Sequence, residues 1–408
     1  MNPAVDARRV IAELRELDRR TGGPGGARRL CWGEEWRAAR AYLGELLAEI
    51  GIEGRADAAG NHWAFLDEDA EGCLVLGSHL DSVPEGGWLD GALGVLAALG
   101  VLRAWSESGR TPPRGLGLVD WADEEGARFG ASLFGSSAFS GTLRVDEVRR
   151  LTDREGRSLP DVLAENGVEL DNALDAASMR PRLGAYLELH IEQGPVMESE
   201  GVAAAAVAGC VGIERHRFDF SGQASHAGTT PMPDRRDAGL AAAETALAVE
   251  RLAVEADGVG TTGALALRPG VVTAVAGEAR LMVDLRHRHA GTLASMLEGS
   301  EAAAREAAEA RGCEFESTPV WRIEPIAFDA ELVARAASAC REAGGRDRPL
   351  VSGALHDAAE AARVAPAAMV FCPSIRGISH AKEEDTDERD LAVAIEAYGE
   401  AANLILDG

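Results

Sequence analysis

Residue types that bind divalent metal ions follow four short apolar segments of this sequence. The segments are residues 73–78, 115–121, 185–191 and 367–372. The polar residues at or just beyond their ends are His79, Asp81 and Asp90, then Asp123, Glu124 and Glu125, then His190, and last Ser379 and His380. Imidazole nitrogens and carboxylate oxygens are donors that zinc and manganese accept without a thiolate. A single such histidine would favour a core position, but four such ends favour a metal site, because these residues are depleted in buried strands.

These ligands can be divided between two ions. Asp90 can bridge both ions through its carboxylate. His79 and His190 then complete the ligands of one ion, and Glu125 and His380 complete those of the other. In two-metal sites the ions lie about 3.5–4 Å apart and share the activation of one water. The sequence therefore predicts a binuclear centre of two divalent ions, zinc or manganese.

Two further carboxylates fit supporting roles at this centre. Asp81 lies two residues after His79 and can accept the other ring N–H, which fixes the tautomer of the imidazole. Glu124 and Glu125 are adjacent at a strand end and cannot both point the same way. One can bind metal while the other, Glu124, faces the substrate and takes the water proton as general base.

The four apolar segments read as buried strands that alternate with helices. Helices are expected at residues 5–19, 33–50, 91–106 and 356–364. This alternation predicts an α/β fold with a mostly parallel sheet covered on both faces. In such a sheet the functional crevice lies beyond the carboxyl ends of the strands, where the proposed ligands fall.

Residues 211–324 follow another pattern. Residues 214–220 and 278–285 alternate between apolar and polar, as half-buried strands do. Residues 236–253 and 293–310 read as helices. The order strand, helix, strand, strand, helix, strand predicts a small α+β domain, 211–324, inserted into a catalytic domain of residues 1–210 and 325–408.

Composition limits the possible partners. The 408-residue chain carries a formal net charge of −26, which repels nucleic acid phosphate and anionic lipid. Its six cysteines form no CxxC pair and are expected to be reduced and mostly buried. The N-terminal residues are charged and include no signal-peptide core, and no membrane span is expected. We therefore expect a cytoplasmic protein that binds neither nucleic acid nor membrane.

Five segments resemble one family of enzymes. They are 77–84 (GSHLDSVP), 124–129 (EEGARF), 190–195 (HIEQGP), 222–232 (GQASHAGTTPM) and 377–380 (GISH). The first resembles the di-metal aminoacylase and carboxypeptidase clan. The whole set resembles its carbamoylase branch of N-carbamoyl-L-amino acid hydrolases, allantoate amidohydrolases and β-ureidopropionases. The likeness runs from about residue 30 to the C-terminus.

The resemblance implies a homodimer with a catalytic domain and an inserted lid domain that also dimerises. It implies the same five metal ligands and the same general base. His226 would polarise the scissile carbonyl, often from across the dimer interface. A small carboxylate-bearing substrate would be bound by residues in both domains: Gln193, Arg286, Thr273, His356 and Ser379.

Two positions depart from the family pattern. Thr273, in the stretch TAVAG, stands where many members have an asparagine that binds the substrate carboxylate. A threonine offers one hydroxyl where asparagine offers an amide. Leu355, in the stretch SGALHDA, stands where glycine is common, next to the pocket residue His356. These departures bear on substrate choice and leave the metal ligands and Glu124 untouched.

The resulting prediction is a metal-dependent hydrolase of a C–N bond in an N-carbamoyl-L-amino acid or a similar ureido acid. An allantoate amidohydrolase is the nearest alternative. An aminoacylase or dipeptidase is disfavoured by Gln193 and the segment 124–129. A non-catalytic metal-binding protein is disfavoured by Glu124, because a pure binder needs no spare base.

Overall fold

The computed structural model describes residues 2–408. Contacts divide the chain into two compact units. The first comprises the residues up to Gly209 and those from Ala327 onward, and the second comprises Cys210–Ile326. These boundaries lie within two residues of the positions at which the sequence pattern changes.

The first unit is built on a nine-stranded sheet with the order β15-β8-β17-β7-β5-β6-β4-β3, with β16 paired to β8. Its strands are β3 (Arg55–Ala56), β4 (His62–Phe65), β5 (Cys73–His79), β6 (Leu116–Trp121), β7 (Leu183–Ile191), β8 (Ala205–Cys210), β15 (Ile326–Ala327), β16 (Leu350–Ser352) and β17 (Ala367–Cys372). The four predicted apolar strands, β17, β7, β5 and β6, are adjacent and parallel. The prediction of a mostly parallel sheet is wrong for the whole sheet, which is mixed, because β3, β4 and β8 pair antiparallel.

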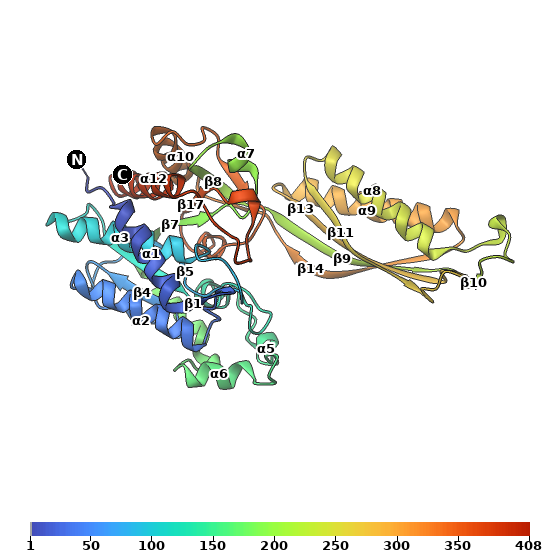
Figure 1. The fold of residues 1–408 in the computed structure, drawn as a ribbon, viewed down its shortest axis with the longest axis horizontal. Helices are drawn as coiled ribbons and strands as arrows, with labels where there is room; N and C mark the ends of the chain where they lie inside the picture. Colours follow the sequence, from blue (N-terminus) through green and yellow to red (C-terminus); the bar gives the residue numbers. More distant parts are fainter. Residues whose placement is uncertain (1) are drawn as a thin grey trace. The chain divides into compact units, whose positions relative to one another are not determined.

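Helices cover both faces of these central strands (Figure 1). Helix α12 (Glu388–Leu406) packs against α3 (Ala92–Ser108) and α10 (Ala330–Glu342), and all three helices pack against the strands. The short helix α11 (Asp357–Ala361) also contacts β5, β7 and β17, and α4 (Phe134–Ser140) packs behind it. Every residue of β5, β6 and β17 is therefore buried, which explains their unbroken apolar character.

Two glycines allow close packing around the end of β5, where the predicted ligands lie. A Cβ atom at Gly77 in β5 would lie 2.0 Å from the carbonyl oxygen of Val119 in β6. Gly91 precedes α3 with a φ of +64°, a conformation that glycine adopts without strain. A side chain there would also collide with the ring of His79, so Gly91 allows Asp90 to lie beside β5.

The second unit has the order β9 (Gly212–Ser221), α8 (Ala238–Glu255), β11 (Val259–Arg268), β13 (Glu278–His287), α9 (Ala290–Ala310) and β14 (Glu314–Ile323). The four strands form an antiparallel sheet in the order β11-β13-β9-β14. Alternate residues of β9 and β13, including Phe218 and Leu281, pack with α8 and α9 in one apolar cluster. A two-stranded sheet of β10 (Ser225–His226) and β12 (Ala274–Val275) is separate from it.

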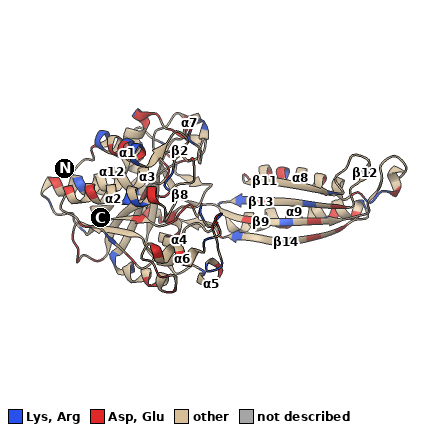
Figure 2. Ribbon diagram, turned by 60° about the horizontal axis from the view of Figure 1, so that its bottom comes forward, with Lys and Arg blue, Asp and Glu red and all other residues tan. Residues whose placement is uncertain are grey.

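The other set of alternate residues in β9 and β13 is mostly charged. Basic and acidic residues are interspersed along the strands in Figure 2. Arg215 on β9 pairs with Asp284 on β13, and Arg280 on β13 pairs with Asp219 on β9. These cross-strand pairs account for the alternation seen in the sequence.

Five of the six cysteines are buried, and Cys313 is partly exposed. Among residues 2–408, no helix is both long enough and apolar enough to cross a membrane.

Candidate metal centre

The ends of the central strands bring together the predicted ligands in the first unit. His79 is the last residue of β5, and His190 lies one residue before the end of β7. Glu125 follows β6, and Asp90 lies just before α3. His380 lies in the loop before α12. The parallel strands end at one edge of the sheet, and their polar residues therefore meet there.

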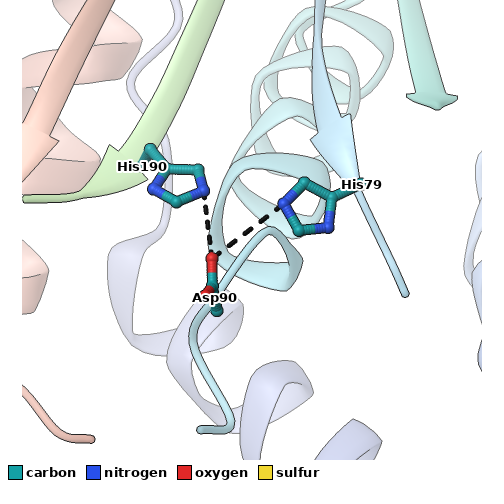
Figure 3. A group of neighbouring side chains, drawn as sticks. All are labelled: His79, Asp90 and His190. Carbon is teal, nitrogen blue, oxygen red and sulfur yellow. Dashed lines mark ion pairs between the residues drawn. The ribbon is translucent and has the colours of Figure 1, made fainter. Parts of the chain in front are cut away.

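His79, Asp90 and His190 form the first group (Figure 3). One ligand atom from each lies within 4.8 Å of those from the other two. The Nε2 atom of His190 is 3.1 Å from Oδ1 of Asp90, and the Nε2 atom of His79 is 3.9 Å from the same oxygen. All three residues are buried.

Both imidazoles are oriented by main-chain carbonyls. Nδ1 of His79 lies 3.1 Å from the carbonyl oxygen of Asp81, and Nδ1 of His190 lies 2.9 Å from that of Ile191. A carbonyl oxygen only accepts hydrogen bonds, so each Nδ1 carries a hydrogen and each Nε2 is directed towards Asp90.

The expected role of the Asp81 carboxylate is corrected by this geometry. Its Oδ1 lies 3.6 Å from Nδ1 of His79, beyond hydrogen-bond distance, because the carbonyl of the same residue takes that place. The two carboxylate oxygens instead accept the backbone N–H groups of Glu124 and Glu125, each at 3.2 Å. Asp81 therefore holds the main chain of the glutamate pair.

Asp90, Glu125 and His380 form a second group with ligand atoms within 4.8 Å of one another. Nε2 of His380 lies 3.5 Å from Oδ2 of Asp90 and 3.5 Å from Oε2 of Glu125. Asp90 thus presents Oδ1 to the first group and Oδ2 to the second. Such a carboxylate could serve two cations, one on each oxygen.

The electrostatics of these groups fit a bound cation. Burial raises the pKa of Glu125 well above its ordinary value, and the charge of Asp90 raises it further. Burial opposes protonation of His190, but the hydrogen bond and charge of Asp90 prevail and raise its pKa to about 9. The nitrogen and oxygen donors thus converge on a region that attracts positive charge. Divalent ions bound there would be coordinated by these donors and would neutralise the buried carboxylates.

Glu124 lies beside the first group and belongs to neither group. Its Oε2 is 3.6 Å from Nε2 of His79. Burial raises the pKa of Glu124 well above its ordinary value, and the nearby charges of Asp357 and Glu125 add to this effect. A carboxylate with a raised pKa, next to a ligand group and outside it, is suited to proton transfer.

The predicted substrate residues of the first unit lie around the ligands. The side-chain amide nitrogen of Gln193 donates to Oδ2 of Asp90 and to Oγ of Ser379, both at 3.1 Å. His356 is only 2% exposed, and its ring lies edge-on to that of His190 with centroids 4.4 Å apart. His356 thus packs against the ring of His190. Its contact with substrate stays a prediction.

The other predicted residues belong to the second unit. The backbone N–H of Gly228 donates to Nδ1 of His226, so the exposed ring carries its hydrogen on Nε2 and can donate it. Nε of Arg286 donates to Asp284 at 2.8 Å, which fixes the guanidinium plane. Thr273 lies next to the β10–β12 sheet, where its carbonyl accepts the N–H of Ala227.

Glu384 and Arg29 are among the buried residues near the predicted ligands that were not identified from the sequence. Glu384 is 1% exposed and accepts the backbone N–H of Asp90. Arg29 is fully buried, and its Nε donates to the carbonyl of Leu80, next to His79. Glu384 lies in a charged run, 382–390, that resembles solvated surface, and Arg29 follows another arginine. Neither position carries a signal that sequence reasoning can use.

A mixed α/β sheet with two histidine–carboxylate groups around a shared aspartate fits a metal-dependent hydrolase. The model of peptidase family M20/M25/M40 matches residues 75–404. The chain belongs to this family, which confirms the predicted kinship.

Curated relatives narrow the enzyme class. The chain is 35% identical to an N-carbamoyl-L-amino acid amidohydrolase of Geobacillus stearothermophilus over 391 residues, which cover 95% of this chain and 94% of the relative. It is 34% identical to an allantoate amidohydrolase of Escherichia coli (91% of each chain) and 32% identical to a ureidoglycolate hydrolase of Arabidopsis thaliana (99% and 88%). The predicted enzyme class, an amidohydrolase acting on C–N bonds other than peptide bonds, is confirmed.

A solved structure of a hydantoinase/carbamoylase family amidase from Burkholderia ambifaria has the same fold. It superposes with a TM-score of 0.87 at 34% identity, covering 100% of this chain and 99% of that one.

Proposed function

We propose that this protein hydrolyses the ureido C–N bond of an N-carbamoyl-L-amino acid or a similar ureido acid, with two divalent ions, zinc or manganese. The observation that carries the proposal is the shared Asp90, with one oxygen facing each ligand group, beside a glutamate that neither group uses. The names of the relatives, all hydrolases of ureido acids or their carbamoyl derivatives, support the substrate class.

The assignment of ligands follows the two groups. His79, Asp90 and His190 would hold one ion, and Asp90, Glu125 and His380 the other. When bound, such ions polarise a carbonyl oxygen and lower the pKa of a water.

The protein groups then carry the protons. Glu124 accepts a proton from the attacking water and returns it to the leaving nitrogen, for which its raised pKa is suited. Asp81 keeps Glu124 in place through the main chain. Gln193 can turn its amide from Asp90 and Ser379 to a ureido group. For a carbamoyl substrate, one water is consumed and an amino acid, ammonia and carbon dioxide are released.

The predicted substrate residues of the second unit lie at opposite ends of its sheet. Arg286 is next to the last residue of β13, whereas His226 and Thr273 lie beyond the Glu278 end. Eight residues of extended strand span about 26 Å, several times the length of a small ureido acid. One substrate cannot contact both ends of one copy, which supports a site completed by a second copy of the chain.

The second unit also has a surface that suits this partner. β11 is an edge strand, and α8 exposes Leu240, Leu247 and Val254 at seven-residue intervals on one side. Antiparallel pairing of two β11 strands about a two-fold axis would set the Val259 end of one against the Arg268 end of the other. Arg286 would then lie at the same end as the partner's His226. We therefore propose a homodimer formed through β11 and α8.

Ammonia release by the purified protein loaded with zinc or manganese tests the proposed activity. The panel comprises N-carbamoyl-L-amino acids with varied side chains, their D-forms, N-carbamoyl-β-alanine, allantoate and ureidoglycolate, with N-acetyl amino acids scored by amine release. Metal-dependent turnover of an N-carbamoyl-L-amino acid is the expected result. Turnover of allantoate alone would favour the second candidate, which the relative of 34% identity supports. Turnover of N-acetyl amino acids alone would contradict the ureido assignment.

A further inference from the structure

Glu384 is a buried carboxylate that connects two of the three segments bearing the second ligand group. It lies in the loop before α12 and is 1% exposed. Oε1 accepts the backbone N–H of Asp90 at 3.1 Å. Oε2 accepts the hydroxyl of Ser379 at 3.1 Å and the backbone N–H of His380 at 3.3 Å. One side chain thus fixes the main chain at two of the three residues of that group.

The two ligand groups differ in how the fold supports them. His79 and His190 extend from central strands, are buried and hydrogen-bond to main-chain carbonyls. The side chain of His380 is 52% exposed and extends from a loop, at a residue with a φ of +55°. No strand positions His380, so its place depends on the hydrogen bonds that hold the loop, among them those accepted by Glu384.

The loop that precedes Asp90 is shaped around the Glu384 carboxylate. A Cβ atom at Gly87 would lie 2.0 Å from Oε1 and 2.1 Å from the carboxyl carbon. The absence of a side chain at Gly87 therefore lets the carboxylate reach Asp90. This close approach offers a second, independent way to displace the carboxylate.

We propose that Glu384 is a positioning residue that assembles the Asp90–Glu125–His380 group and sets its affinity for the second metal ion. The inference rests on the proposed two-ion site. It predicts a larger effect on the second ion than on the first, because Glu384 holds both Asp90 and His380 of the second group but only the shared Asp90 of the first. Groups that orient metal ligands typically contribute about 10- to 100-fold to metal affinity.

The test measures metal content and affinity in the whole protein. Wild-type protein, Glu384→Ala and Glu384→Gln are loaded with zinc, passed over a desalting column and analysed by mass spectrometry. Cobalt titrations followed by absorption then resolve the two binding steps. Glu383→Gln is the matched control, because Glu383 is the exposed neighbour with the same charge.

The expected result is two ions per wild-type and control chain and one ion per Glu384→Ala chain. The weaker dissociation constant rises by about tenfold or more, while the tighter constant stays within about threefold. Glu384→Gln keeps an acceptor for one N–H, so its affinity for the second ion should fall between those of the wild type and Glu384→Ala. Gly87→Ala, which displaces the carboxylate without removing it, should reproduce the Glu384→Ala pattern.

Each outcome is decisive for one of the two proposals. Fewer than two ions in the wild-type protein would overturn the two-ion site itself. Two ions bound with wild-type affinities by Glu384→Ala would overturn the role of Glu384 and leave the site standing. Loss of both ions from a folded variant would also overturn that role, because the predicted effect is selective. If Glu384→Ala does not fold, Glu384→Gln and Gly87→Ala decide the question by the same measurements.

Discussion

Glu124 and Glu125 are neighbours in the chain and belong to different parts of the site. Glu125 faces His380 in the second ligand group. Glu124 faces His79 in the first group and belongs to neither group. Asp81 separates them by accepting one backbone N–H from each. The proposed ligand and the proposed base therefore come from one short stretch of chain, and a change in Glu124 need not disturb the proposed metal ligands.

Glu124→Gln tests this separation. The amide keeps the size of the side chain and cannot take a proton, so kcat should fall by about 10²- to 10⁴-fold. Metal content should stay at the wild-type value, since Glu124 is in neither ligand group. Steady-state kinetics and metal analysis on the same preparation check both points. Unchanged turnover would remove Glu124 from the mechanism, and loss of metal would make it a ligand.

His62 on β4 makes stability depend on pH. Burial lowers the pKa of its imidazole to about 4, and the charge of Arg40 contributes in the same direction. The unfolded chain, with a pKa of about 6.5, binds the proton more readily. The contribution of the neutral His62 ring to the free energy of unfolding is therefore fully present above pH 6.5. It is lost as the pH falls from about 6.5 to 4, and the loss reaches up to about 3 kcal/mol.

His62→Gln measures this contribution, because glutamine does not titrate. Urea unfolding of both proteins at pH 7.5 and pH 4.5 gives the difference in free energy of unfolding at each pH. Between pH 7.5 and pH 4.5, the free energy of unfolding of the variant should rise relative to that of the wild type by about 1–3 kcal/mol. An equal difference at both pH values would show that His62 is accessible to protons in the folded protein.

The residues that converge on the candidate site could be predicted from the sequence, and the residues that support them could not. His79, Asp90 and His190 follow apolar segments, where a polar residue is unexpected and therefore informative. Arg29 and Glu384 act through main-chain hydrogen bonds to segments remote in sequence. Such contacts depend on the course of loops, and local residue patterns do not encode that course. The sequence also assigned Asp81 to the His79 ring, which a main-chain carbonyl orients instead.

At the scale of elements, the packing of α3 on the central strands fixes the distances between ligands. Gly94, in the first turn of α3, faces β5 and β7. A Cβ atom there would lie 2.4 Å from the carbonyl oxygen of Leu189 and 2.6 Å from Cβ of Ser78. Those two residues directly precede His190 and His79. The closeness of helix and sheet therefore determines where both histidines lie.

Gly94→Ala should separate α3 from these strands and destabilise the protein by about 1–3 kcal/mol through overpacking. Its metal content should fall as well. Gly44→Ala in α2 (Glu34–Glu49) is the matched control, because nothing lies within 4 Å of the added Cβ. Alanine is the better helix former, so the control should be more stable by about 0.5–1 kcal/mol. Urea denaturation of both variants gives these values. Equal effects would mean that α3 is not closely packed at Gly94.

The central elements were predictable, and the edges of the sheet were not. Strands β5, β6, β7 and β17 are apolar runs of six to nine residues. The edge strand β3 and its neighbour β4 have two and four residues, too few for a periodic pattern to appear. β4 also pairs with β6 instead of its sequence neighbour β5, which only the tertiary fold determines. The mixed character of the sheet follows from these edges.

At the scale of the whole molecule, the separation of Arg286 from His226 decides how many copies form a working site. Both residues are placed by secondary structure within one unit, at opposite ends of β13 and its neighbours. If both contact one substrate molecule, they belong to different chains. A shared site of this kind makes a prediction about mixtures of two inactive variants.

Arg286→Ala and His226→Ala should each reduce turnover strongly as homodimers, since every site lacks one of the two side chains. In a heterodimer of the two variants, one site has lost both residues and the other has retained both. Unfolding and refolding equal amounts together gives about half heterodimers, so about a quarter of wild-type activity should return. Refolding each variant alone provides the control. If both residues served substrate from the same chain, every site in the mixture would lack one of them, and activity would stay at the level of the separate variants.

Leu247→Glu on the exposed face of α8 should block dimerisation and so prevent this recovery of activity. Light scattering should then show monomers.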